Sequence, residues 1–194
     1  MIILASKSSS RRAMLDAAGV AYEAAPANVD ERALEAELAD HAPAEVALAL
    51  ARAKAAALSG TNPGRIILGS DSLVSVEGKR FDKPADRAAA TAHLRYFSGR
   101  TMDLHSAAAL VRGGETLWQH TEMAQLMVRK LSEDFIEGYL DAEWPEVSYC
   151  VGVFRIEARG VQLFESITGD QFTVLGMPLL PLLGALRNLG EMPS

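Results

Sequence analysis

The chain has 194 residues and a formal net charge of −6 at pH 7, with 49% hydrophobic and 23% charged residues. This balance excludes an intrinsically disordered chain, and the acidic total argues against a protein that coats DNA or RNA through a basic surface. A chain of this length can bury a sizeable core, so we expect residues 1–194 to form a single domain.

In chain order, the apolar patterns predict a strand at 2–5, helices at 11–18 and 43–58, a strand at 65–76 and a helix at 86–97. Strands at 102–111 and 117–128, a helix from Ser132 to about 140, strands at 151–156 and 163–167, and a helix at 179–189 follow. Turns at Glu77-Gly78 and Gly113-Gly114 indicate hairpins. Strands that alternate with helices and hairpins predict an α/β fold with a mixed, twisted sheet and flanking helices.

Other features of the sequence concern the compartment. Cys150 is the only cysteine, which rules out an internal disulfide and favours a reducing compartment. No apolar run reaches the roughly 18 residues that a membrane span needs. The first residues are apolar and then basic, which is the reverse of a secretory signal. We therefore expect a cytoplasmic protein without a membrane partner.

Basic residues gather in two parts of this acidic chain, residues 1–15 and residues 50–101. The first part contains the run from Ser6 to Arg12, between a predicted strand and a predicted helix. Ser6 and Ser8 supply hydroxyls, Arg11 and Arg12 supply guanidinium groups, and the helix start supplies free N–H groups, so the run can cradle a phosphate. Serines that cap a helix beside solvated arginines are the alternative.

Asp71 follows the apolar strand residues at 66–68, where a ligand of an α/β sheet would meet it. An Asp at a strand end also forms turns, which is the alternative. Lys83 lies just across the predicted hairpin, so Asp71 and Lys83 can face one pocket. The pair would offer the Asp71 carboxylate to a metal or a water molecule and the Lys83 ammonium to a phosphate.

Three further charged residues are weak candidates by themselves. Glu31 and Lys54 can equally belong to solvated helix faces. Glu157 is expected on a strand before Gly160, where it can accept N–H groups of a guanine or simply point outward. The four histidines lack metal-ligand spacing and are expected to pack or face solvent.

Together these segments resemble the Maf family of nucleoside triphosphate pyrophosphatases. The resemblance runs along nearly the whole chain, through Leu4-Ala-Ser-x-Ser-x-x-Arg11-Arg12, Val29-Asp30-Glu31, Leu50-Ala-x-x-Lys54-Ala, Gly69-Ser-Asp71, Lys83-Pro84, Ser98-Gly99, Gly169-Asp170 and Gly176-x-Pro178-Leu179. It implies an ITPase-like fold with two lobes around a cleft for a nucleotide and a divalent metal.

The C-terminal half resembles the branch of the family that prefers 7-methyl-GTP, through Cys150-Val-Gly152-Val-Phe154-Arg-Ile-Glu157. The dTTP- and UTP-preferring branch carries Lys-Ala-Gly and a Gln at the position of Glu157, and this preference stays as an alternative. The sequence departs from the family pattern at Ser9-Ser10, Ser72, Asp82 and Val151.

The resemblance implies hydrolysis of a nucleoside triphosphate to the monophosphate and pyrophosphate, as a house-cleaning activity. Arg11, Arg12, Lys54 and Lys83 would neutralise the phosphates, with Ser6 and Ser8 in the phosphate cradle. Glu31 and Asp71 would hold Mg²⁺, Mn²⁺ or Co²⁺. Asp71 is assigned as the base that activates water, with direct metal ligation as the alternative.

Two other kinds of function compete with this enzyme. One is a nucleotide-binding regulator of cell division or septum formation with little turnover, although the acids Glu31 and Asp71 would repel a phosphate unless a metal bridges them. The other is a nucleic-acid-binding module that uses Arg52, Lys54, Lys79 and Arg80, which the acidic neighbouring segments disfavour. A homodimer is expected only because family members are commonly dimeric.

Overall fold

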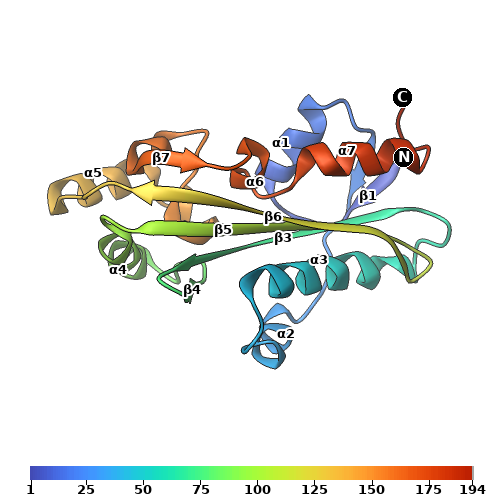
Figure 1. The fold of residues 1–194 in the computed structure, drawn as a ribbon, viewed down its shortest axis with the longest axis horizontal. Coiled ribbons are helices and arrows are strands. Elements are labelled where there is room, and N and C mark those ends of the chain that lie inside the picture. Colours follow the sequence, from blue (N-terminus) through green and yellow to red (C-terminus); the bar gives the residue numbers. More distant parts are fainter. Residues whose placement is uncertain (194) are drawn as a thin grey trace. The chain divides into compact units, whose positions relative to one another are not determined.

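A computed structural model describes residues 1–193 of the chain (Figure 1). Its strands are β1 (Ile2–Leu4), β2 (Tyr22–Ala24), β3 (Ile67–Val76), β4 (Lys79–Phe81), β5 (Thr101–Arg112), β6 (Glu115–Val128) and β7 (Phe164–Thr168). Its α-helices are α1 (Ser9–Ala17), α2 (Glu31–Glu37), α3 (Pro43–Ser59), α4 (Arg87–Phe97), α5 (Glu133–Glu143), α6 (Gln171–Val174) and α7 (Leu179–Asn188). Three 3₁₀ turns cover Glu146–Tyr149, Val151–Val153 and Arg159–Leu163.

The strands form one seven-stranded sheet in the order β2-β1-β3-β5-β6-β7, with β4 paired to β3. β1 is parallel to both β2 and β3, whereas β4 and β7 are antiparallel to their partners. The predicted α/β class with a mixed sheet and flanking helices is confirmed. Both predicted hairpin turns are also present, because Glu77-Gly78 and Gly113-Gly114 adopt the positive φ angles that tight two-residue turns require.

The contacts divide the chain into two compact units. The first unit comprises residues 1–72 and 105–122, together with the chain from Asp170 onward; the second comprises 73–104 and 123–169. β3, β5 and β6 each contribute residues to both.

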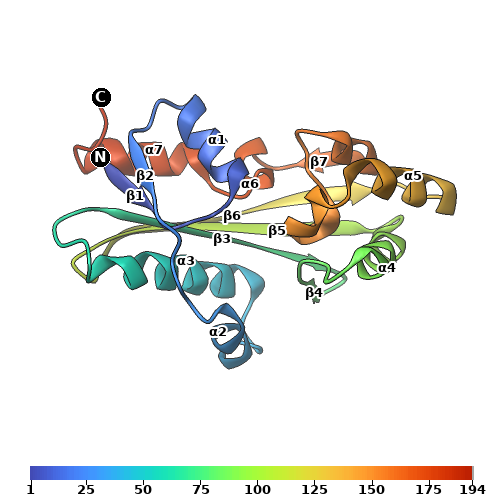
Figure 2. The ribbon, with the colours of Figure 1, turned by 180° about the vertical axis from the view of Figure 1, so that it is seen from behind.

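In the first unit, helices cover both faces of the sheet, with α1 and α7 on one face and α3 on the other (Figures 1 and 2). Side chains of β1 alternate between these faces, as the pleat of a strand requires. Ile2 and Leu4 join the cluster that includes Leu15 and Leu182, whereas Ile3 packs with the helix α3 residue Ala55. Because both faces of this strand are buried, it is apolar throughout.

In the second unit, α4 contacts α5, and ion pairs join the two helices. Arg95 donates to both carboxylate oxygens of Glu133, and Arg87 pairs with Asp141. Phe81 of β4 packs edge-on against Phe97, which is buried. Aromatic packing therefore anchors α4 on the β3–β4 hairpin.

The predicted strand at 151–156 is wrong, and with it the expected strand environment of Glu157. Residues 151–153 form a 3₁₀ turn in which Gly152 has φ +82° and Val153 φ +58°, so the backbone cannot stay extended. Glu157 lies exposed in a turn. The apolar run at 151–154 is typical of a strand, but here it forms an irregular segment that contributes buried side chains. The short elements β2, α2 and α6 were not predicted.

His93 of α4 gives the second unit a pH-dependent contribution to stability. Burial lowers the pKa of the imidazole from its ordinary value of 6.5. Its Nδ1 is buried and, within residues 1–193, has no hydrogen-bond partner. Below about pH 6.5 the unfolded chain binds this proton more readily than the folded chain, so stability is lost as the pH falls.

We expect the stability of the wild-type protein to fall more steeply between pH 7.5 and pH 5 than that of His93→Leu. Urea unfolding at several pH values measures this difference. The same change at exposed His41 is the matched control. Parallel pH profiles for wild type and His93→Leu would contradict the assignment.

Candidate functional site

Asp71 is positioned by the alternation of side chains along β3. Gly69 and Asp71 point to the face that α3 covers, whereas Ser70 and Ser72 point to the face of α1. A Cβ at Gly69 would lie 1.9 Å from the carbonyl oxygen of Ala51. Glycine at 69 therefore allows α3 to pack unusually close to the strand, directly beside Asp71.

This close packing brings Lys54 of α3 to Asp71. The Nζ of Lys54 lies 2.5 Å from Oδ1 of Asp71 and 3.0 Å from Oε2 of Glu31. Lys54 and Asp71 have side chains only 12% and 11% exposed, and Glu31 is 46% exposed. Asp30 caps α2 by accepting from the N–H of Ala33, which fixes Glu31 in the first turn. The structure thus brings together three predicted site residues.

Arg11 approaches the same acids from α1. The Arg11 residue is 9% exposed, and its guanidinium donates from Nε to the carbonyl of Gly176 at 2.9 Å and from Nη2 to Ser72 Oγ at 3.1 Å. Burial lowers the pKa of Arg11, while the charges of Asp71 and Glu31 oppose that shift. The two carboxylates therefore stabilise a cation that would otherwise be costly to bury.

The serines of the predicted phosphate cradle take part in the same network. Ser8 caps α1 by accepting from the N–H of Arg11, so the capping alternative describes what its hydroxyl does. Ser6 Oγ accepts from the N–H of Ser8 and from Nη1 of Arg11. Arg12 is exposed and donates to the carbonyl of Lys7.

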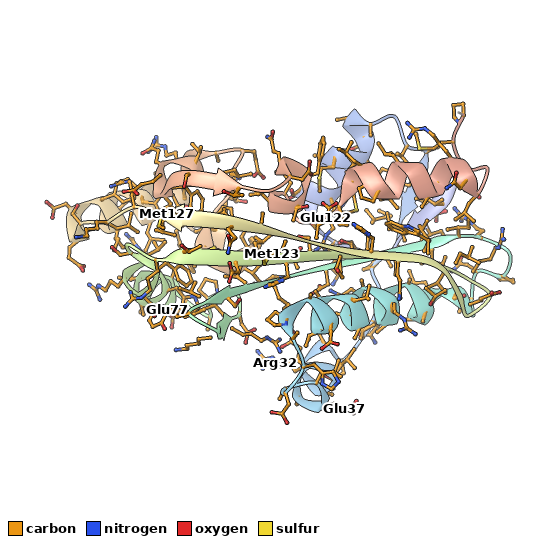
Figure 3. All side chains as sticks on the ribbon, viewed as in Figure 1. Arg32, Glu37, Glu77, Glu122, Met123 and Met127 are labelled. Carbon is orange, nitrogen blue, oxygen red and sulfur yellow. The ribbon has the colours of Figure 1, made fainter. Side chains whose placement is uncertain are left out.

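The sequence analysis missed the buried residues that contact the hydrogen-bond partners of Arg11. Ser106 of β5 is fully buried, donates to the carbonyl of Thr173 at 2.8 Å and lies 3.0 Å from Ser72 Oγ. Thr173 donates in turn to Glu122, which lies on β6 beside α6 (Figure 3). The available signal was a serine directly before the apolar run at 107–111, because a buried hydroxyl there needs a hydrogen-bond partner.

Gly176 completes this support because its carbonyl accepts three hydrogen bonds. The donors are Arg11 Nε, Ser72 Oγ and Ser70 Oγ, at 2.9, 3.0 and 3.3 Å. Gly176 has φ +103°, and a Cβ there would lie 3.2 Å from Ser72 Oγ. A residue with a side chain is strained in this conformation, so the carbonyl depends on glycine.

Lys83 and Glu157 belong to the second unit. Both act electrostatically on Cys150: burial and the charge of Glu157 raise the pKa of its thiol, and Lys83 opposes that shift. The irregular segment that carries Glu157 is anchored by an ion pair from Arg155 to buried Glu143. The approach of Lys83 to Asp71, which the hairpin suggested, stays a prediction.

The donor set of the first unit fits a hard divalent cation. One oxygen of Glu31 and one of Asp71 face the same point, which is occupied here by Nζ of Lys54. Within residues 1–193, no group of three or more His, Cys, Asp or Glu side chains could hold a metal ion. Two carboxylates with substrate phosphates are nevertheless a common set of ligands for Mg²⁺.

No helix in the described part of the chain is long and apolar enough to cross a membrane.

Comparison with known proteins gives a family match over residues 1–189, to the family described as Maf-like protein. A protein of Mesorhizobium japonicum named 7-methyl-GTP pyrophosphatase is 50% identical over 98% of this chain and 97% of its own length. A protein of Nitrobacter hamburgensis named nucleoside triphosphate pyrophosphatase is 46% identical over 97% of this chain and 94% of its own. A solved HAM1 protein of Coxiella burnetii covers 66% of this chain and 72% of its own, with 18% identity and a TM-score of 0.41.

Proposed function

The chain belongs to the Maf family, and from this premise we propose that it is a nucleoside triphosphate pyrophosphatase with a preference for 7-methyl-GTP. Water attacks the α-phosphorus of the nucleotide, and the bond from this phosphorus to the oxygen that bridges it to the β-phosphorus breaks. The products are a nucleoside monophosphate and pyrophosphate. The observation that carries the proposal is the cluster of two cations and two carboxylates in the first unit, beside the N-terminus of α1.

Each side chain of this cluster serves one demand of the reaction. Asp71 accepts the proton of the attacking water, because it is a carboxylate held in a buried position at the strand. Lys54 and the N–H groups at the start of α1 attract the phosphates, with Ser6 and Ser8 beside them. Arg11 donates to protein groups and so fixes this cradle while adding positive charge.

Glu31 and Asp71 are the residues that would hold Mg²⁺, Mn²⁺ or Co²⁺. When bound, such an ion polarises the phosphoryl oxygens and neutralises the charge of the leaving pyrophosphate. Exposed Arg12, and Lys83 from the second unit, complete the positive charge that the triphosphate needs. We place this activity in the cytoplasm, which the single, unpaired Cys150 supports.

Glu157 is proposed to select the base. Its carboxylate can accept the N1–H and N2–H groups of a guanine, whereas a glutamine there can serve a pyrimidine edge. The exposure of Glu157 in its turn leaves the carboxylate available to a ligand.

We expect Glu157→Gln to weaken 7-methyl-GTP by roughly 1–3 kcal/mol in kcat/KM while UTP changes little. Pyrophosphate release from 7-methyl-GTP, GTP, dTTP, UTP and ITP, each with Mg²⁺, Mn²⁺ or Co²⁺, measures both activity and preference. Glu165→Gln, at another exposed acid of the second unit, is the control. Absence of pyrophosphate release with every nucleotide and metal would refute the proposed function, and an unchanged ranking would remove Glu157 from the base site.

A further inference from the structure

Lys54 stands where the proposed function requires a metal ion. Its Nζ lies 2.5 Å from Asp71 Oδ1 and 3.0 Å from Glu31 Oε2, the two oxygens expected to bind the cation. The ammonium is thus the counter-ion of both carboxylates. An ammonium and a divalent cation repel each other and cannot share one position between the same two oxygens.

The packing of α3 keeps Lys54 in this position. The absence of a side chain at Gly69 lets the helix approach β3 so closely that Lys54 is only 12% exposed. Lys54 therefore has little solvent to turn toward, and its withdrawal would leave two carboxylates without their shared cation. Only a strongly anionic ligand at the site would compensate an ammonium for leaving both acids.

We propose that Lys54 excludes divalent cations from Glu31 and Asp71 until the phosphates of a nucleotide draw its ammonium away. This inference rests on the proposed function. Its consequence is an order of events: the free protein binds the metal weakly, and the nucleotide must arrive before or together with the ion. The same side chain first neutralises the acids and then the phosphates, so the site is protected from a metal ion without substrate.

The test is direct Mn²⁺ binding in the absence of nucleotide, measured by electron paramagnetic resonance of free Mn²⁺ and by calorimetry. Lys54→Met removes the charge, and Lys54→Gln removes it while keeping hydrogen-bond donors for the acids if the Met variant folds poorly. We expect both to bind Mn²⁺ at least ~10-fold more tightly than wild type. Lys54→Arg should bind it as weakly as wild type, and so should the control Lys79→Met, whose charge lies over the Phe81 ring in the second unit.

Thermal unfolding provides a second readout that does not depend on activity. Mn²⁺ should raise the Tm of Lys54→Met or Lys54→Gln more than that of wild type, because the ion would replace the missing counter-ion in the folded state only. Equal Mn²⁺ affinity in wild type and both neutral variants would overturn the inference. If Asp71→Asn nevertheless weakened Mn²⁺ binding, the proposed metal site would stand without Lys54 guarding it. Tight Mn²⁺ binding that survives loss of both Glu31 and Asp71 would instead refute the site itself.

Discussion

Asp71→Asn is expected to lower pyrophosphate release by at least ~10²-fold while the protein keeps its fold. Asparagine has the shape of aspartate, so the packing of β3 against α3 is retained. It cannot take a proton from water, and it offers a divalent cation a much weaker ligand. Lys54 keeps an ion pair with Glu31, which limits the loss of stability.

The measurement is kcat with 7-methyl-GTP, accompanied by circular dichroism and the Tm. Asp16→Asn, at an exposed acid on α1 in the same unit, is the matched control and should retain full activity. Mn²⁺ binding with nucleotide present separates the two roles considered for Asp71. Lost turnover with retained Mn²⁺ affinity identifies the base, and loss of both identifies a ligand; undiminished turnover would end either assignment.

Gly69→Ala is expected to destabilise the protein by about 3 kcal/mol or more and to abolish activity together with it. The new Cβ would lie 1.9 Å from Ala51 O and 2.8 Å from the backbone nitrogen of Ala55. These are backbone atoms of a long helix, so they cannot turn aside as a flexible side chain would. The helix must shift away from β3, and Lys54 then loses its contact with Asp71.

Gly60→Ala is the control for this prediction. Gly60, at the end of α3, has ordinary helical angles, and a Cβ added there would meet no atom of the described neighbours within 4 Å. Urea unfolding and pyrophosphate release compare the two variants. Full activity in a folded Gly69→Ala protein would show that the close approach of α3 does not set the site.

The sequence by itself determined those elements whose signals are local. The alanine-rich helix α3 has strong intrinsic helix propensity with Pro43 at its first position. β1 is apolar because both of its faces are buried, and β3 carries apolar residues at both ends of its buried length. The hairpin turns were readable because Gly78 and Gly113-Gly114 suit positive φ angles. The order of motifs along the chain also identified the family, since it reflects the whole sequence and no single contact.

Only the tertiary structure decided what the charged side chains do. Arg11 and Gly176 are 165 residues apart, yet Nε of Arg11, which the sequence analysis assigned to a phosphate, donates to the carbonyl of Gly176. The sequence assigned Lys54 to the phosphates, and only the structure shows that close packing at Gly69 also pairs it with both acids. The residue type determines the charge and hydrogen-bonding capacity of a side chain. Its partners depend on which segments the fold brings within hydrogen-bonding distance. That choice is made by packing between distant elements, so no local pattern contains it.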